Sequence, residues 1–199
     1  MRQRSRRLVP LFAAICACGQ APQPASPAAA STWSIPTGWK HETIPFPLEF
    51  APSLAHRGIE ELRFPPGFLD ETAPNRWSYT FVWRLDEPAM LDAEALGHEL
   101  EVYFRGLLAA VDGDKHRLDP AQITASASGT STPDRFTLSA HVIDTFRSAG
   151  PVDLTGWAHR TTCGSGALWT FVLAPEGSPI RMTLDELAAQ ATCEQAAVR

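Results

Sequence analysis

The clearest hydrophobic pattern along the chain is an alternation over residues 77–85. A period of two predicts a β-strand with one aromatic face. Because aromatic side chains bury large areas, this face is predicted to form the centre of the core. The alternative is that it lines the site of a ligand. The face consists of Trp77, Tyr79, Phe81, Trp83 and Leu85.

A helical pattern follows over residues 92–111. Asp92 is placed to cap the N-terminus of this helix, and Gly113 is placed to end it. Apolar side chains at helical spacing predict one buried stripe. The stripe consists of Leu96, Leu100, Tyr103, Phe104, Leu107, Leu108 and Val111.

A second helix is predicted over residues 183–193, where Thr183 and Glu186 have the spacing of a capping box. Shorter segments with strand character fill most of the remaining chain, and Gly164-Ser165-Gly166 is predicted to be a hairpin turn between two of them. The pattern therefore predicts an α+β domain: a single antiparallel sheet of about five to six strands, covered by two main helices. The strand segments are residues 58–64, 77–85, 122–128, 135–146, 152–163 and 167–173, with residues 42–50 as a further edge candidate.

The N-terminus has the features of an export signal. Four arginines precede the apolar residues 8–17, a segment too short to span a bilayer. The tetrad Ile15-Cys16-Ala17-Cys18 resembles the lipobox of bacterial lipoproteins. This resemblance implies cleavage after Ala17, a diacylglycerol on Cys18 and, with Gly19 next, sorting to the outer membrane of a Gram-negative cell. Lipidation with two or more acyl chains gives stable anchoring. The alternative is an ordinary cleaved secretory signal.

The chain is predicted to have three parts. Residues 1–17 are the signal peptide, residues 18–32 are a lipidated tether, and residues 33–199 are a single globular domain. Residues 21–32 hold three prolines, no charge and no large apolar side chain, so they are predicted to stay extended and to reach at most roughly 40 Å.

The net charge of the chain limits the classes of function that the sequence allows. The formal net charge is −5, and removal of the signal takes away four arginines, which leaves 13 basic against 22 acidic residues, or −9. An acidic domain without a cluster of lysine or arginine is not expected to bind nucleic acid. After the signal, no apolar run approaches the about 18 residues of a transmembrane helix.

Two cysteines lie outside the signal. Thiols of exported proteins are usually oxidised, so Cys163 and Cys193 are predicted to form a disulfide. A closed loop of this size contributes roughly 3–4 kcal/mol in the chain-entropy description. The alternative is a metal or nucleophilic site, because His159 lies four residues before Cys163.

Few residues point to catalysis. The chain has no P-loop, dinucleotide fingerprint or zinc motif, so no cofactor and no metal are predicted. Alternation turns one of Glu60 and Glu61 inward, where it is either a general acid or base or the ion-pair partner of Arg84. His141 and Asp144 lie three apart on a strand, hence on opposite faces, and cannot form a local dyad.

These observations favour a membrane-anchored envelope lipoprotein that acts as a non-enzymatic binding or assembly module. Its expected partners are the membrane, through Cys18, and an envelope protein. Two alternatives remain: a small periplasmic hydrolase that uses Glu60 or Glu61, and a carrier of a small hydrophobic ligand. The stretches GWKHETIPFPLEFAPSL and WSYTFVWRL resemble segments of bacterial exported proteins of no assigned activity, so this resemblance implies no function.

Overall fold

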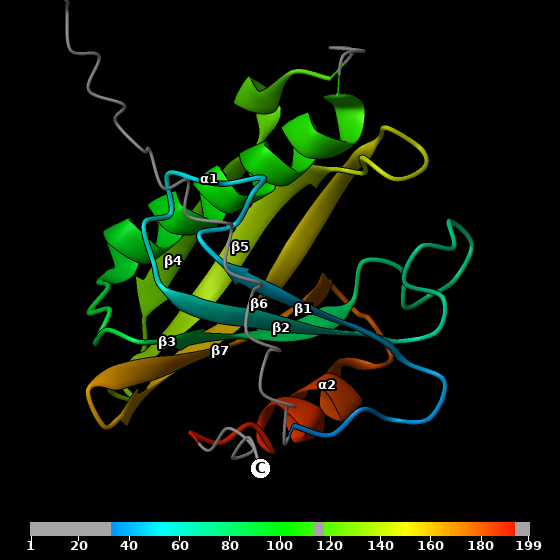
Figure 1. Ribbon diagram of the computed structural model, residues 1–199. Helices are drawn as coiled ribbons and strands as arrows, with labels where there is room; N and C mark the ends of the chain where they lie inside the picture. Colours follow the sequence, from blue (N-terminus) through cyan, green and yellow to red (C-terminus); the bar gives the residue numbers. More distant parts are fainter. Residues whose placement is uncertain (1–32, 114–117, 194–199) are drawn as a thin grey trace, which may run out of the picture.

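The computed structural model describes residues 33–113 and 118–193. The lipobox, Cys18 and the tether therefore lie outside the described residues. Seven strands form one antiparallel sheet in the order β1-β2-β3-β7-β6-β5-β4 (Figure 1). The strands are β1 (Lys40–Phe46), β2 (Gly58–Phe64), β3 (Tyr79–Leu85), β4 (Thr124–Gly129), β5 (Arg135–Ile143), β6 (Pro151–Cys163) and β7 (Gly166–Pro175).

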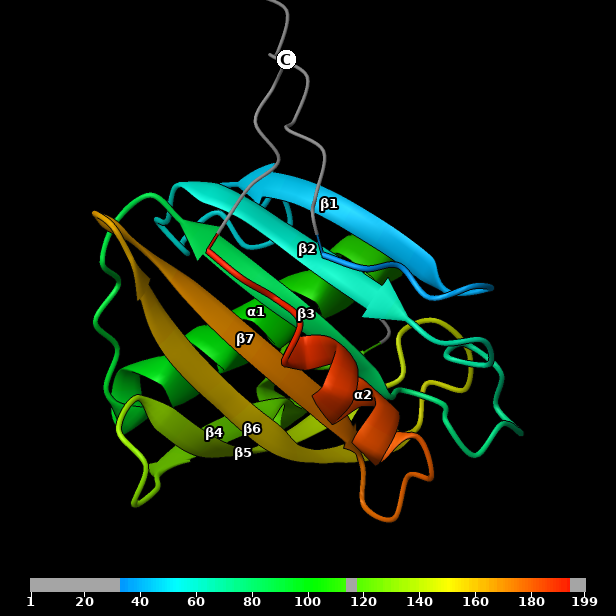
Figure 2. The same cartoon turned by 90° about the horizontal axis from the view of Figure 1, so that it is seen from below.

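Two helices lie on opposite faces of this sheet. Helix α1 (Ala93–Asp112) crosses one face and packs mainly on β4 and β5, whereas α2 (Arg181–Ala188) lies on the other face against β3 and β7. Figure 2 shows α2 in front of the sheet and α1 behind it. No helix among the described residues is long and apolar enough to cross a membrane.

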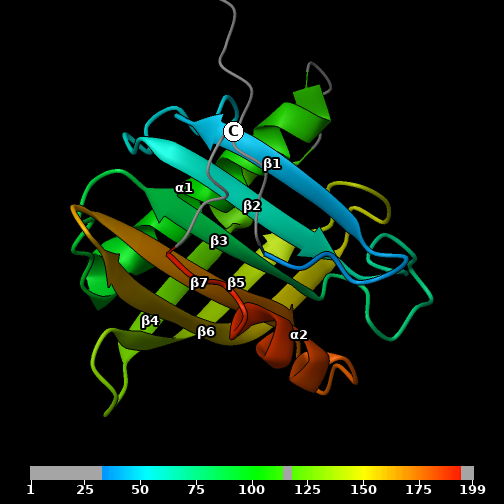
Figure 3. The same ribbon diagram turned by 60° about the horizontal axis from the view of Figure 1, so that its bottom comes forward.

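The predicted α+β class, with a single antiparallel sheet and two helices, is confirmed. The sheet has seven strands rather than five to six, because the proline-rich edge candidate does form a strand. It spans Lys40–Phe46 and pairs along its whole length with β2. Pro45 fits there because an edge strand leaves one side of its backbone without a neighbour (Figure 3).

Helix α1 begins and ends within one residue of the bounds that local sequence signals predicted. The Asp92 carboxylate accepts a hydrogen bond from the Ala95 N–H at 2.9 Å, and the helix ends at Gly113, whose φ is +53°. This φ lies in the left-handed region that favours glycine. The caps and the apolar stripe together predicted this helix, except that Val111 at its end is exposed rather than buried.

The capping box predicted for α2 is wrong. The helix begins at Arg181, has no side-chain cap and ends at Ala188 instead of residue 193. Its start is held by tertiary contacts, because the Arg181 guanidinium donates to the Thr155 hydroxyl at 3.0 Å and to the Ala174 carbonyl at 3.1 Å. After Ala188 the chain leaves the helix, and the Arg84 side chain holds the Thr192 carbonyl.

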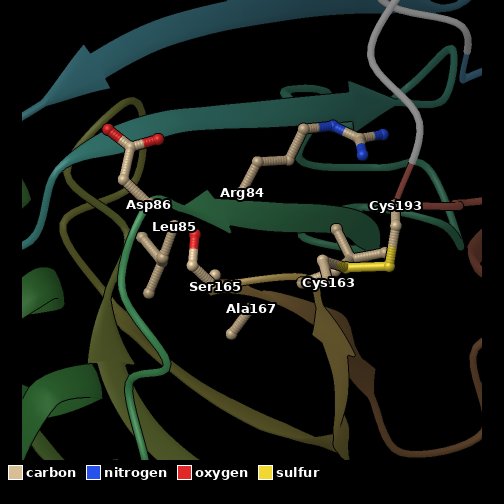
Figure 4. A pocket seen from close by; sticks show the side chains of 9 residues that line it. Arg84, Leu85, Asp86, Cys163, Ser165, Ala167 and Cys193 are labelled. Carbon is tan, nitrogen blue, oxygen red and sulfur yellow. A yellow bond between two sulfur atoms is a disulfide. The ribbon is translucent and has the colours of Figure 1, made fainter.

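The predicted disulfide between Cys163 and Cys193 is confirmed, with a Cα–Cα distance of 5.3 Å. It joins the segment after α2 to the end of β6. The disulfide borders a hollow beside Arg84 and Ser165 (Figure 4). The turn from β6 to β7 falls at Gly164–Ser165, as the hairpin prediction required.

The aromatic face of β3 forms the centre of the core, as predicted. The Phe81 ring stacks on Phe171 of β7, with centroids 4.4 Å apart, and on Tyr103 of α1 at 5.9 Å. The opposite face is buried as well, because α2 and Trp33 cover it. Every residue of β3 is consequently buried.

Candidate ligand cavity

A cavity of about 1000 Å³ lies between the β1-β2-β3 edge of the sheet, the connection from β2 to β3, and α1. Its walls are mainly apolar. The charged side chains that border it, such as Lys40, Asp70 and Arg147, are exposed, so the cavity opens to solvent on their side. Most of the aromatic lining comes from six residues: Phe64, Phe68, Trp77, Tyr79, Tyr103 and Phe146.

The aromatic wall is continuous. The Phe68 ring lies 4.7 Å from Phe64, 5.5 Å from Tyr79 and 5.8 Å from Trp77, measured between centroids, and Trp77 lies 5.7 Å from Phe146. Trp77 adopts a φ of +55°, which is unusual for a bulky residue and occurs where the surrounding structure imposes it. Its N–H bonds the Phe68 carbonyl at 3.1 Å, which fixes the end of the β2–β3 connection.

The connection between β1 and β2 closes another side of the cavity. Phe50 lines the cavity and meets Tyr103 edge to face at 5.1 Å. The backbone of this connection lies directly on α1 at Gly106, where an added Cβ would come within 2.1 Å of the Phe50 carbonyl oxygen. Only glycine allows this close approach.

His56 links the β1–β2 connection to neighbouring parts of the chain. Its Nδ1 lies 2.9 Å from Glu87 and its Nε2 lies 2.9 Å from Glu99 of α1. Burial lowers the pKa of His56, but the hydrogen bonds and charges of Glu99 and Glu87 outweigh burial and raise the pKa overall. Both ring nitrogens are therefore engaged in holding the connection in place.

Glu60 of β2 points toward the α1 face and is fully buried. The Trp83 indole donates to its Oε1 at 3.0 Å, and its Oε2 has no hydrogen-bond partner among the described residues. Burial raises the pKa of Glu60 to about 8, against the opposing effect of the Trp83 and Tyr103 donors, and the charge of Glu42 adds to the rise. A carboxyl group with this pKa is mostly neutral at pH 7.

Glu61 faces the opposite side of the sheet. Arg84 Nε lies 2.7 Å from its Oε2, and Arg63 lies 3.9 Å from its Oε1. Glu61, and not Glu60, therefore forms the ion pair with Arg84 that the sequence analysis considered. Sequence alternation placed the two glutamates on opposite faces but implied that only one is buried; both are, because α2 and Trp33 cover the second face.

The other residues considered for catalysis do not come together. His141 pairs with Asp153 on the neighbouring strand at 2.6 Å, and both side chains are exposed. Asp144 instead pairs with Arg76. Cys163 is oxidised, and among the described residues no three His, Cys, Asp or Glu side chains are grouped so that they could hold a metal ion.

The hollow beside the disulfide has a volume of about 410 Å³ (Figure 4). Arg84 is its one buried charged residue, and the Arg84 guanidinium is bound to Glu61 and to the Thr192 carbonyl. Its third nitrogen, Nη2, is buried and has no hydrogen-bond partner among the described residues.

Comparison of the chain with protein-family models, with curated proteins and with solved structures finds no match.

The sequence offered a ligand site on the aromatic face only as an alternative and did not show where a cavity lies; of that face, Trp77 and Tyr79 line it. Its wall is formed by residues from β1 to β3, α1 and the segment after β5, and no local pattern shows that they enclose a space. One signal was present: the turn-forming connection between β2 and β3 carries large apolar side chains at Phe68 and Leu69, between polar and proline positions. Large apolar residues in a connection need an apolar surface to cover or to line.

Proposed function

We propose that the protein is a lipid-anchored, exported binding protein that holds a small, largely apolar molecule in the cavity beneath α1. The observation that carries this proposal is the cavity of about 1000 Å³ with its aromatic wall. Small-molecule sites have volumes of about 300–1000 Å³ and are lined mainly by apolar and aromatic side chains. The proposal is the carrier alternative of the sequence analysis, within its preferred class of non-enzymatic binding modules.

The position of Trp33 is compatible with an anchored carrier. Trp33 packs on the α2 face, where its indole donates to the Leu187 carbonyl at 2.8 Å. The cavity lies on the α1 face. In the proposal, the tether behind Cys18 therefore joins the domain on the face opposite the cavity, and the anchor holds the protein at the periplasmic side of the outer membrane. An envelope protein partner stays a prediction.

The hydrolase alternative has less support. Glu60 lies behind the cavity wall, and no described histidine bonds to either Glu60 or Glu61, because His56 is occupied by Glu87 and Glu99. A general acid or base must come within hydrogen-bonding reach of the reacting group. Binding without chemistry is therefore the function that the geometry supports best.

The test uses a soluble form of the protein, in which residues 19–199 follow an ordinary cleavable secretory signal. This form contains all seven strands, both helices and the disulfide, and export keeps the oxidising environment. N-phenyl-1-naphthylamine, which fluoresces strongly only in apolar surroundings, is titrated into it. We expect the fluorescence of the dye to rise to saturation, with one binding site per protein molecule.

Two variants on β1 make the test specific. Ile44→Trp places an indole into the cavity, whereas Thr43→Trp is the matched control, because Thr43 is exposed and points to the opposite side of the strand. We expect Ile44→Trp to weaken binding of the dye at least about tenfold and Thr43→Trp to leave it unchanged. Absence of saturable binding in the parent protein, or equal binding by both variants, overturns the proposal.

A further inference from the structure

Two positively charged side chains at the mouth of the cavity take no part in holding the fold together. Lys40 and Arg147 both border the cavity and are exposed. Among the lysine and arginine side chains of residues 33–113 and 118–193, they are the ones that form no ion pair, hydrogen bond or ring contact. The others are all engaged: Arg57, Arg63, Arg76, Arg84, Arg105, Arg135, Arg160 and Arg181. Two positive charges are therefore available where a ligand would enter.

Lys40 lies at one end of the aromatic wall. Lys40, Glu42 and Ile44 are alternate residues of β1 that line the cavity, so the Lys40 side chain leaves the strand on the cavity side. Lys40 is paired in the sheet with Phe64 of β2, whose ring lies 4.7 Å from Phe68. A lysine in this place can lay its apolar stem along the wall and keep its ammonium group in water at the mouth.

Arg147 lies at the other end of the wall, beside Phe146. The turn that carries both residues is fixed by the buried Asp144 carboxylate, whose Oδ1 accepts from the N–H groups of Phe146 at 3.1 Å and Arg147 at 3.2 Å. The side chain that pairs with Asp144 is Arg76, not Arg147. The backbone of Arg147 is therefore held in place, whereas its guanidinium group is open to an anion.

Acidic residues also border the mouth. They are Glu42, Asp70 and Glu71, and all are exposed. The N–H and the hydroxyl of Thr72 both donate to Asp70 Oδ1, at 2.9 and 2.8 Å. Exposed acids without a partner occur away from the cavity as well, for example at Glu49 and Glu94, whereas in the described part of the chain exposed cations without a partner occur only at this mouth. The acids therefore restrict a ligand to few negative charges, and the two cations determine where a charge can be bound.

We infer that the ligand is an amphipathic acid, with an apolar body against the aromatic wall and one carboxylate or similar acid group at the mouth, held by Lys40 and Arg147. The inference deepens the proposed function and rests on it. The aromatic wall binds apolar molecules that fit, and the two cations select among these molecules by charge. Because both cations are exposed, each contributes a modest part of the affinity, and salt screens this part.

Two compounds with the same ring test this selection. 1-Naphthylacetate carries a carboxylate that is ionised at about pH 7, and 2-(1-naphthyl)ethanol carries a hydroxyl in its place. Each is used to displace N-phenyl-1-naphthylamine from the soluble form. The preference for the acid is the ratio of the inhibition constant of the alcohol to that of the acid. We expect the parent protein to prefer the acid in about 10 mM sodium chloride and to lose this preference in about 500 mM.

Single substitutions locate the acid group. Lys40→Gln and Arg147→Gln should each lower the preference for the acid roughly two- to fivefold at low salt, the range for one exposed ion pair. Glu42→Gln should raise the preference, because it removes a negative charge from the mouth. Arg57→Gln is the matched control: the Arg57 side chain is 76% exposed and does not line the cavity, so loss of its charge should leave the preference unchanged.

The outcomes separate the two proposals. If N-phenyl-1-naphthylamine does not bind the parent protein, the proposed function fails. If the dye binds and the acid displaces it no better than the alcohol at low salt, the cavity stands and the inference is overturned. The inference is also overturned if neither Lys40→Gln nor Arg147→Gln lowers the preference, or if Arg57→Gln lowers it as much as they do. A loss of preference in one of the two variants alone refutes the shared site.

Discussion

Replacement of Glu60 by glutamine is expected to stabilise the protein at neutral and alkaline pH and to change little at pH 5. Burial raises the pKa of this carboxyl group from 4.5 to about 8. Between these two values the folded state holds a proton that the unfolded state has released. The free energy of unfolding therefore falls as pH rises through this window, and stays level above it. Glutamine keeps the acceptor for the Trp83 indole but does not titrate.

The size of this stability difference follows from the shift in the pKa of Glu60. Each pKa unit corresponds to about 1.4 kcal/mol, so ionisation of the buried Glu60 costs on the order of 4–5 kcal/mol across the full window. At pH 7, part of the way through this window, the free energy of unfolding has fallen by about 3 kcal/mol. Glu60→Gln should therefore exceed the parent protein in stability by about 3 kcal/mol at pH 7 and by on the order of 4 kcal/mol at pH 8–9.

Urea unfolding of the soluble form between pH 5 and pH 9, with the disulfide intact, measures this difference. Other titrating groups, such as His56, are common to both proteins and cancel in the comparison. Glu61→Gln is the matched control: it removes the buried negative charge that pairs with Arg84 and should destabilise the protein by about 3–5 kcal/mol at pH 7. A difference between Glu60→Gln and the parent protein that stays constant from pH 5 to pH 9 would refute a neutral Glu60.

Three further predictions concern contacts that stabilise the fold. Replacement of Cys163 and Cys193 by serine should lower the free energy of urea unfolding by roughly 3–4 kcal/mol; an unchanged midpoint contradicts a stabilising disulfide. The raised pKa of His56 means that its stabilisation is complete below pH 6.5 and is lost as pH rises through the folded-state pKa. His56→Gln should therefore cost more stability at pH 5.5 than at pH 9, and the opposite trend refutes the pairing. Gly106→Ala should destabilise by roughly 1–3 kcal/mol in thermal unfolding, because its Cβ collides with the Phe50 carbonyl; no loss means that this contact is absent.

Features determined by short-range chemistry could be predicted from the sequence. The strand around Phe81 follows from strict alternation, and the start of α1 follows from the Asp92 cap, which the structure places within one residue. The disulfide required only the inference that two cysteines share an oxidising compartment. In each case the deciding residues lie close together in the sequence or leave one possible pairing.

Features determined by long-range packing could not be predicted. Thr183 and Glu186 have the spacing of a capping box, yet contacts of Arg181 with β6 and β7 place the start of α2 two residues earlier. Alternation along β2 separates Glu60 from Glu61, but it does not show that both faces of the sheet are covered. The cavity depends on how α1 lies over the β1–β2 connection at Gly106, a contact between segments about 55 residues apart.

A crystal structure of the soluble form grown with N-phenyl-1-naphthylamine shows directly whether the cavity binds an apolar molecule. We expect the dye to lie between the β1-β2-β3 edge and α1, in contact with Phe68 and Tyr103. A dye bound elsewhere on the protein, or a cavity filled by protein side chains in the presence of saturating dye, would contradict it.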